Sequence, residues 1–150
     1  MRALFLCATL VAFTAAAVPP GSIQARPETM QWSAASPAMP AGTQIAVLEG
    51  NPKNEGMFTI RLKVPASSRI PPHWHPRDER VTVLSGTVIV GFGDTIEESA
   101  LLKFGAGSFY VNPANVHHYV LFPDESVVQI TGVGPWEVHF LDARAAAPAR

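Results

Sequence analysis

Short β-type runs, separated by turns that are rich in proline and glycine, dominate this sequence. The chain has 150 residues, of which 14 are proline and 11 are glycine, and such frequent breaks leave no stretch that is typical of a long helix. Apolar and polar residues alternate over 57–64, for example, and the run ends at Pro65. This pattern is typical of a strand with one buried face. We therefore expect an all-β fold.

Strand-like runs recur from residue 43 almost to the end of the chain. Residues 80–90 contain two of them, on either side of a turn at Ser85 and Gly86. The remaining runs cover residues 44–48, 57–64, 109–111, 118–122, 127–133 and 136–141. About eight short strands within about 100 residues predict an all-β sandwich or a small barrel.

The first 25 residues have the order of a secretory signal peptide. Arg2 precedes an apolar run over 3–18, which small and turn-forming residues follow. The run of about 16 residues is shorter than the roughly 20 residues that a membrane-spanning helix needs, so a signal peptide is favoured over a membrane anchor. Cleavage after Ala25 fits best, although Ala17 also satisfies the small-residue rule. We expect a secreted or periplasmic protein that has no membrane contact after signal cleavage.

Signal cleavage would also remove Cys7, which is the single cysteine. The mature chain would then have 125 residues, with 10 Lys and Arg against 12 Asp and Glu, a net charge of −2. Without cysteine it can form neither disulfides nor thiolate–metal bonds. A slightly acidic chain also argues against nucleic acid as a partner, so a small-molecule substrate is the expected partner.

Two segments that flank the strand region show no period. Residues 26–42 are rich in Pro, Ala, Ser and Met, and we expect an N-terminal arm that uses Trp32 as its anchor. This arm either wraps onto the barrel or a neighbouring subunit, or stays mobile. Residues 143–150 contain only Ala, Pro and Arg and predict a frayed tail. The folded domain is therefore expected over residues 43–142.

The first of two histidine groups contains His73 and His75. Side chains alternate between faces along an extended strand, so these two point the same way, with Trp74 on the opposite face. Glu79 has the same parity and can reach the same face if the strand resumes after Pro76. Alone, a His-x-His pair is more often a surface feature or part of a hydrogen-bonded core than a metal site.

The second histidine group is the pair His117 and His118. Adjacent residues on a strand cannot both face inward. Val120 and Phe122 are apolar and have the parity of His118, so we expect His118 to face the interior and His117 to lie at the rim.

Three imidazoles and one carboxylate that converge inside a barrel would form a site for one divalent metal ion. Six-coordinate Fe, Mn or Ni is favoured because two positions stay open for water or substrate, whereas Zn or Co are the alternatives. The predicted metal ligands are His73, His75, Glu79 and His118. Glu79 is also the predicted catalytic residue, since a carboxylate that leaves the metal can act as a general base.

The spacing of these residues resembles the two conserved motifs of the cupin superfamily. The motifs here read His73-x-His75-x3-Glu79-x6-Gly86 and Gly107-x5-Pro113-x-Asn115-x2-His118. The resemblance covers residues 43–142 and implies a double-stranded β-helix, or jelly-roll barrel, with the same four ligands. Three positions depart from the family pattern without affecting a ligand: Ser67 and Asn115 stand at usual glycine positions, and Phe122 at a usual Asn.

The resemblance implies a metal-dependent enzyme, with dioxygenase as the leading activity on a small oxygen-bearing organic molecule. An isomerase or decarboxylase is the next choice, because this fold carries many chemistries. A non-catalytic module that binds or senses a metal or small ligand is the rival class. Small barrels of this superfamily often pair, so a homodimer joined through the arm is a further expectation.

Several other residues are weaker candidates. Trp74 and Trp136 are expected to pack, and His139 to face away from the apolar layer. Five polar residues occur on runs expected to line the barrel and are candidate substrate contacts: Tyr110, Asn112, Tyr119, Gln129 and Thr131.

Overall fold

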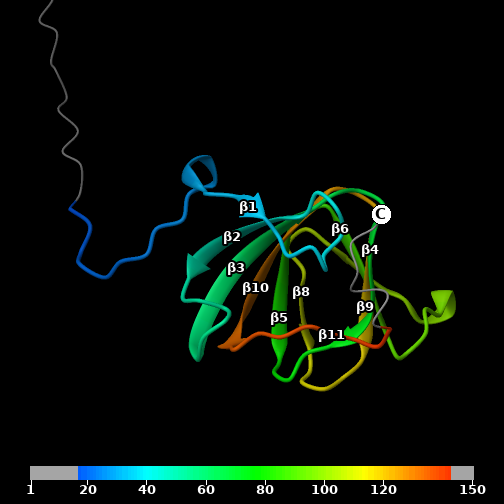
Figure 1. Cartoon of the computed structure of the whole chain (residues 1–150). Coiled ribbons are helices and arrows are strands. Elements are labelled where there is room, and N and C mark those ends of the chain that lie inside the picture. The colour runs from blue at the N-terminus through cyan, green and yellow to red at the C-terminus, as the bar shows by residue number, and fades with distance from the viewer. Residues whose placement is uncertain (1–16, 143–150) are drawn as a thin grey trace, which may run out of the picture.

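A computed structural model describes residues 17–142, and these residues form eleven β-strands and two 3-10 helices (Figure 1). Residues 1–16 of the expected signal peptide and the expected tail at 143–150 lie outside the described residues. The 3-10 helices are η1 (Pro27–Thr29) and η2 (Glu98–Ala100). The strands are β1 (Ser33–Ala34), β2 (Gln44–Glu49), β3 (Gly56–Val64), β4 (Ser68–Trp74), β5 (Glu79–Ser85), β6 (Thr87–Phe92), β7 (Leu102–Gly105), β8 (Phe109–Asn112), β9 (His118–Phe122), β10 (Ser126–Gly134) and β11 (His139–Phe140).

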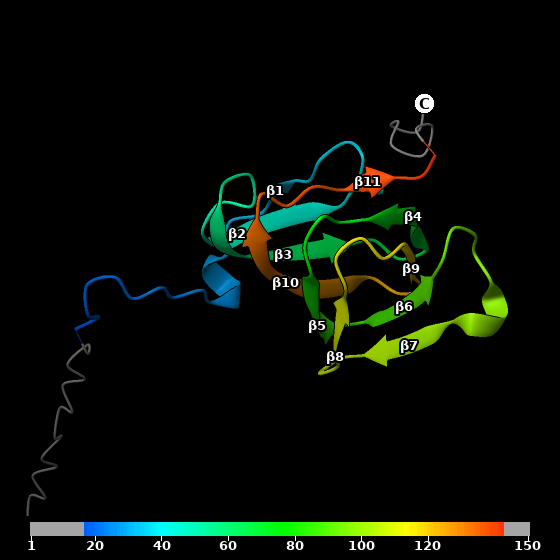
Figure 2. The same ribbon diagram turned by 90° about the horizontal axis from the view of Figure 1, so that it is seen from below.

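The strands form two antiparallel sheets that face each other, as Figure 2 shows. The six-stranded sheet has the order β1-β2-β3-β10-β5-β8, and the five-stranded sheet has the order β11-β4-β9-β6-β7. Consecutive strands thus lie in different sheets at several points along the chain, as in a jelly roll. The predicted all-β jelly-roll fold is confirmed. No helix among residues 17–142 is long and apolar enough to cross a membrane.

The inner faces of the two sheets form one hydrophobic core. Strand β3 shows the cause, because every second residue from Phe58 to Val64 is buried while the residues that alternate with them are only partly buried. A buried side chain of this size contributes about 1.5–3 kcal/mol relative to an exposed one. The same alternation in β5, β6, β9 and β10, together with Leu62 of β3 and Ile70 of β4, completes the core: Val81, Val83, Val88, Val90, Val120, Phe122, Val128 and Ile130.

Positive φ angles occur at the positions where the cupin pattern has glycine. Gly86 has a φ of 77°, and a Cβ there would overlap the Ser126 hydroxyl and the Glu125 carbonyl. Ser67 and Asn115, the two departures from the pattern, still adopt the left-handed conformation, with φ of 60° and 61°. The backbone geometry of both turns is therefore kept without glycine.

Most predicted strands are present, but four elements differ. The expected strand over 136–141 is mostly irregular, and only β11 remains of it. Strands β1 and β7 were not predicted, because each is short and lies at or near a sheet edge. Strand β4 includes Pro71 and Pro72, which normally argue against a strand. Its pairing with β9 shifts register between Ile70 and His73, and this irregularity accommodates both prolines.

The expected N-terminal arm contacts the barrel in two ways. Strand β1 pairs with β2 through Ser33 and Ala34. Trp32 lies under the ammonium group of Lys63, which is 5.0 Å from the ring centre, a cation–π contact.

Candidate metal centre

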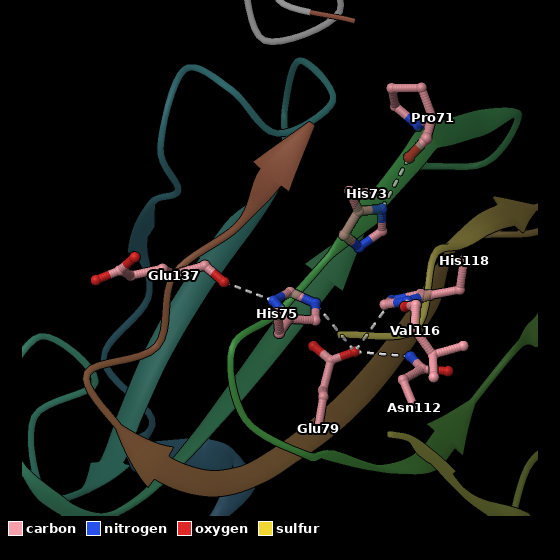
Figure 3. Close-up of polar contacts among 8 residues, drawn as sticks. All are labelled: Pro71, His73, His75, Glu79, Asn112, Val116, His118 and Glu137. Carbon is pink, nitrogen blue, oxygen red and sulfur yellow. Dashed lines mark hydrogen bonds and ion pairs between the residues drawn. The ribbon is translucent and has the colours of Figure 1, made fainter. Parts of the chain in front are cut away.

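Three histidines from two adjacent strands and the turn between the sheets meet at one end of the barrel (Figure 3). His73 on β4 is the cross-strand partner of His118, the first residue of β9. His75 follows the end of β4, and Glu79 opens β5 in the other sheet. The four residues that were expected to converge therefore lie close together: His73, His75, Glu79 and His118.

The three imidazoles are close together and shielded from solvent. One ring nitrogen of each lies within 4.8 Å of the others. The exposed fractions of His73, His75 and His118 are 3%, 2% and 0%. His75 also stacks on Trp136, with 5.4 Å between ring centres. Rings that are packed in this way are held in a fixed geometry, which favours metal binding over transient contacts.

Backbone carbonyl groups fix the tautomer of each ring. The Nδ1 atoms of His73, His75 and His118 lie 2.8, 2.7 and 3.1 Å from the carbonyl oxygens of Pro71, Glu137 and Val116. Because a carbonyl only accepts, each Nδ1 carries the hydrogen and each Nε2 keeps its lone pair.

Two of these lone pairs are buried without a partner. Within residues 17–142, Nε2 of His75 and Nε2 of His118 have no hydrogen-bond partner. Unpartnered buried nitrogen atoms cost free energy, and a divalent cation bound between the rings would remove that cost. The donor set of three imidazoles therefore fits a first-row divalent metal.

Glu79 lies beside two of the three rings. Its Oε2 atom is 3.6 Å from Nε2 of His75 and 3.8 Å from Nε2 of His118, and only 6% of the residue is exposed. Asn112 donates to the same oxygen over 2.8 Å. Asn112, a candidate substrate contact in the sequence, therefore orients the carboxylate.

Burial sets the protonation of the site. It lowers the pKa of His73 to about 3, and the neighbouring His118 contributes to the shift. Burial also lowers the pKa of His118, partly opposed by the Glu79 carboxylate. Burial raises the pKa of Tyr110, and Glu79 raises it further. At neutral pH, His73 and His118 are therefore neutral, as ligands must be, and the Tyr110 hydroxyl keeps its proton.

Two hydrogen bonds join the loops that carry the histidines. The Asn115 amide donates to the His75 carbonyl over 2.8 Å. The Ala114 amide donates to Asp78 Oδ1 over 3.0 Å, and Arg80 contacts the other oxygen of Asp78 at 3.1 Å. Sequence reasoning did not assign Asp78 this role, because its partner is 36 residues away in the chain.

The other two histidines lie outside the cluster, as expected from parity. His117 is partly exposed and contacts Asp94 at 2.6 Å. His139 stacks on Trp74 with 4.2 Å between ring centres and contacts Glu137 at 2.9 Å.

Three of the weaker candidates do not line the barrel, so that prediction is wrong. The Tyr119 hydroxyl interacts with the backbone of Glu97. Gln129 accepts a hydrogen bond from Arg61, and Thr131 contacts Thr59. All three alternate with inward-facing neighbours and therefore lie on the outer faces of the sheets.

A small cavity adjoins the cluster. Its volume is about 30 Å³, which is room for only two or three water molecules at about 10–15 Å³ each. Polar groups enter it from His73, His75, Glu79 and Tyr110, and the other lining residues are apolar. Met39 from the arm also lines this cavity. This contact could not be predicted, because the sequence of the arm has no period.

Residues 21–137 match the ChrR Cupin-like domain family. The chain belongs to this cupin family. Solved structures agree on the fold of this cupin. A putative acetylacetone dioxygenase from Methylibium petroleiphilum has a TM-score of 0.64 and 18% identity, with 89% of each chain covered. The polyketide cyclase RemF from Streptomyces resistomycificus has the same TM-score and 14% identity, with 79% of this chain and 84% of the other covered.

Further similarities are more partial. A manganese oxalate decarboxylase from Bacillus subtilis has a TM-score of 0.55 and 13% identity, covering 76% of this cupin and 31% of that chain. Germin-like protein 3-1 from Oryza sativa subsp. japonica is 36% identical over 67 residues, 44% of this cupin and 30% of the relative. A germin-like protein from Arabidopsis thaliana is 33% identical over 81 residues, 52% of this cupin and 37% of the relative. This cupin thus spans about a third of the curated relatives it matches.

Proposed function

We propose that this cupin is an exported, metal-dependent enzyme of the dioxygenase type. In this proposal His73, His75 and His118 bind one divalent metal through Nε2, with Glu79 as the fourth ligand. The observation that carries the proposal is the common tautomer of the three rings. Each Nδ1 donates to a carbonyl, and two of the three Nε2 atoms are buried without a partner among the described residues.

The donor set favours Fe, Mn or Ni over Zn or Co. A site with three imidazoles and one carboxylate leaves two positions open on a six-coordinate ion. When bound, such an ion supplies Lewis acidity and a place where an oxygen-bearing substrate and O₂ can meet. The manganese oxalate decarboxylase among the structural neighbours is consistent with this choice.

The chain's own residues would position the substrate and move its proton. Asn112 holds Oε2 of Glu79, which leaves the other carboxylate oxygen available to accept a proton from a substrate carbon or hydroxyl. The Tyr110 hydroxyl stays protonated beside this carboxylate and lines the same cavity. It would donate a hydrogen bond to a substrate oxygen and so orient the substrate. The apolar remainder of the cavity would exclude water.

Dioxygenase chemistry is preferred over other reactions for two reasons. Glu79 is the one carboxylate among the residues that line the cavity, which include no Ser, Thr, Cys or Lys, so in this proposal the metal supplies the remaining reactivity. In addition, the putative acetylacetone dioxygenase covers more of this chain than the cyclase or the decarboxylase does. An isomerase or decarboxylase is the next choice on the same scaffold.

A non-catalytic metal-binding or ligand-sensing module is the second candidate. One observation favours it: the cavity beside the cluster, about 30 Å³, is too small for an organic substrate unless the protein moves. In that case the metal, with zinc as the first choice, would brace the ends of β4, β5 and β9.

Location and partners complete the proposal. The N-terminal 25 residues support export as a secreted or periplasmic protein, with no membrane contact after cleavage. The expected partner is a small molecule rather than nucleic acid, because the chain has no excess of basic residues. A homodimer remains part of the proposal, and sedimentation would test it.

Metal analysis of protein purified from its native compartment is the first test. The proposal expects about one equivalent of Fe, Mn or Ni, and the variant His75→Ala should lose it. His117→Ala is the matched control, since His117 lies at the rim and should leave the metal content unchanged. Stoichiometric Zn without exchangeable water would contradict the dioxygenase assignment, and unchanged metal in His75→Ala would contradict the ligand set.

Oxygen uptake then tests the reaction. We expect the metal-loaded protein to consume O₂ with at least one member of a panel of β-diketones and flavonols. Glu79→Gln should lower the turnover rate more strongly than the metal content. Full metal loading without O₂ uptake on any panel member would favour the non-catalytic candidate.

A further inference from the structure

A larger apolar groove lies outside the cavity at the metal centre. Its volume is about 520 Å³, large enough for a small organic molecule. Residues of the N-terminal arm form one wall, and strands β2, β3 and β11 with the segments beside them form the other. The lining residues are Ala34, Ala35, Ser36, Ala38, Met39, Ile45, Pro52, Lys53, Leu62, Trp136, Val138 and Phe140.

The groove and the inner cavity share part of their walls. Met39, Leu62, Trp136 and Val138 line both. These four side chains therefore form a partition, with His73, His75 and Glu79 on the inner side. Leu62 is fixed within β3, whereas Met39 comes from the arm and is only partly buried. Methionine is unbranched and adapts its shape easily, so Met39 is the member of the partition best able to move.

The segment that carries Met39 is bonded mainly to itself. Ser36 accepts hydrogen bonds from Met39 and Ala38, and Pro40 accepts two from Thr43. The Ala35 amide donates to the Thr43 carbonyl over 3.0 Å and closes the base of the loop. The hydrogen bonds of residues 36–42 in the structure all stay within 35–43. Such a self-contained loop can shift as a unit without breaking barrel hydrogen bonds.

We propose that this groove binds the apolar body of the substrate, and that Met39 on the 36–42 loop is the gate through which the substrate's oxygen-bearing end reaches the histidine cluster. The inference rests on the proposed function, because it assumes that the cluster is the reaction site. The inner cavity of about 30 Å³ is too small for an organic substrate. Displacement of the Met39 side chain would connect this cavity to the groove of about 520 Å³ and so give the substrate room.

The lining defines the chemical class of the occupant. Lys53 is the single charged residue among the groove-lining residues, and the others are almost all apolar. At the partition, Nε1 of Trp136 is buried and has no hydrogen-bond partner within the described residues. An apolar organic acid fits these features: its carboxylate meets Lys53 at the exposed rim, and an oxygen atom near its other end satisfies the Trp136 donor.

Binding to the metal-free protein tests the groove apart from the metal. The probe is 2-naphthoate, and 2-naphthamide is its uncharged counterpart of the same shape, each titrated by calorimetry. We expect 2-naphthoate to bind more tightly, and Lys53→Ala to remove an advantage of about two- to fivefold, the usual range for an exposed charge pair. Lys103→Ala is the matched control, because Lys103 is exposed on β7 in the other sheet.

Metal exchange tests the gate apart from the groove. Met39→Ala should speed both metal uptake and chelator-driven release by similar factors, so that the equilibrium Kd stays nearly constant. A merely structural defect would instead change the Kd. Met39→Trp, which fills the partition, should slow both rates and weaken 2-naphthoate binding. Met57→Ala is the control, since Met57 is 59% exposed and lines neither space.

The outcomes separate this inference from the proposed function. If 2-naphthoate binds but no metal does, the groove stands and the proposed enzyme fails. If metal binds while neither naphthalene probe does, or while Met39→Trp leaves binding and both exchange rates unchanged, the groove and gate are wrong. Equal affinity for 2-naphthoate and 2-naphthamide would overturn the assignment of an acidic occupant.

Discussion

Asn112 donates a hydrogen bond to Oε2 of Glu79 over 2.8 Å, although the two residues are 33 positions apart. Both are buried, and Glu79 and Asn112 are direct cross-strand partners in the β5–β8 pair. The carboxylate oxygen nearest to His75 and His118 is therefore held by the sheet and not by solvent. Partners of this kind fix the direction of a metal ligand.

Removing the Asn112 amide should therefore weaken metal binding without abolishing it. We expect Asn112→Ala to raise the metal Kd by about 10-fold, the lower end of the effect of losing such a partner. Competition with a chromophoric chelator measures it. Asn54→Ala, at an exposed turn position, is the control and should leave the Kd unchanged. An unchanged Kd in Asn112→Ala would show that Glu79 is held by other contacts or does not bind the metal.

The buried histidines should make the metal-free protein sensitive to acid. The pKa of His73 falls from 6.5 to about 3 on folding, so the unfolded chain binds the proton more tightly. Proton uptake by the unfolded chain therefore lowers the free energy of unfolding in acid. The effect is absent above pH 6.5 and grows as the pH falls toward 3, by about 1.4 kcal/mol per pH unit per histidine. The pKa of His118 is also lowered and acts in the same direction.

Urea unfolding of the metal-free protein at pH 7.5 and pH 5.5 measures this dependence. We expect a clear loss of unfolding free energy at the lower pH, and His73→Phe should reduce that loss. Equal stability at the two pH values would contradict the burial of neutral imidazoles in the metal-free protein.

The candidate ligands could be predicted because strand parity is a local property. His73 and His75 follow from alternation within one short segment, and His118 follows from its apolar neighbours. Glu79 has the same parity but reaches the cluster from β5 in the other sheet, so motif spacing predicts it and alternation along one strand does not. The same parity places Tyr119 on the outer face, opposite to His118, but it does not show what covers the ring there. Its ring is buried on the outer face of β9, against Gly91 and the segment that contains Glu97, and that covering is a long-range feature.

The irregular parts of the fold also escaped prediction for physical reasons. In β4, Pro71 and Pro72 argue against a strand in the sequence, but a register shift lets β4 pair with β9 on both sides of the two prolines. The role of Met39 depends on how the arm lies over the barrel, for which its sequence has no period. Motif spacing thus identified the cluster itself, whereas the groove and its gate required the packed structure.

Gly86 should be essential to the turn between β5 and β6. An alanine there adopts a φ of 77° at a cost of about 1–2 kcal/mol, and its Cβ also overlaps Ser126. Gly107→Ala is the matched control, because Gly107 has a φ of 85° but open space around its Cβ position. We expect Gly86→Ala to lower the free energy of unfolding more than Gly107→Ala does, measured by urea titration. Equal losses would show that Ser126 moves away freely.

Asp78 should couple the two histidine loops through the Ala114 amide. Asp78→Ala leaves that partly buried amide without its acceptor, a loss of about 1–2 kcal/mol in stability. Since Ala114 lies four residues before His118, we also expect the metal Kd to rise severalfold in the chelator competition assay. Asp78→Asn keeps the accepting oxygen and should restore most of the affinity.

Arg80→Ala distinguishes this role of Asp78 from its surface ion pair. That variant removes only the contact between Arg80 and Asp78, whose side chains are 47% and 44% exposed, and an exposed pair contributes little. We expect Arg80→Ala to retain the metal Kd and the stability of the parent protein. If Arg80→Ala weakened metal binding as much as Asp78→Ala, the charge of the pair and not the Ala114 hydrogen bond would hold the second histidine loop.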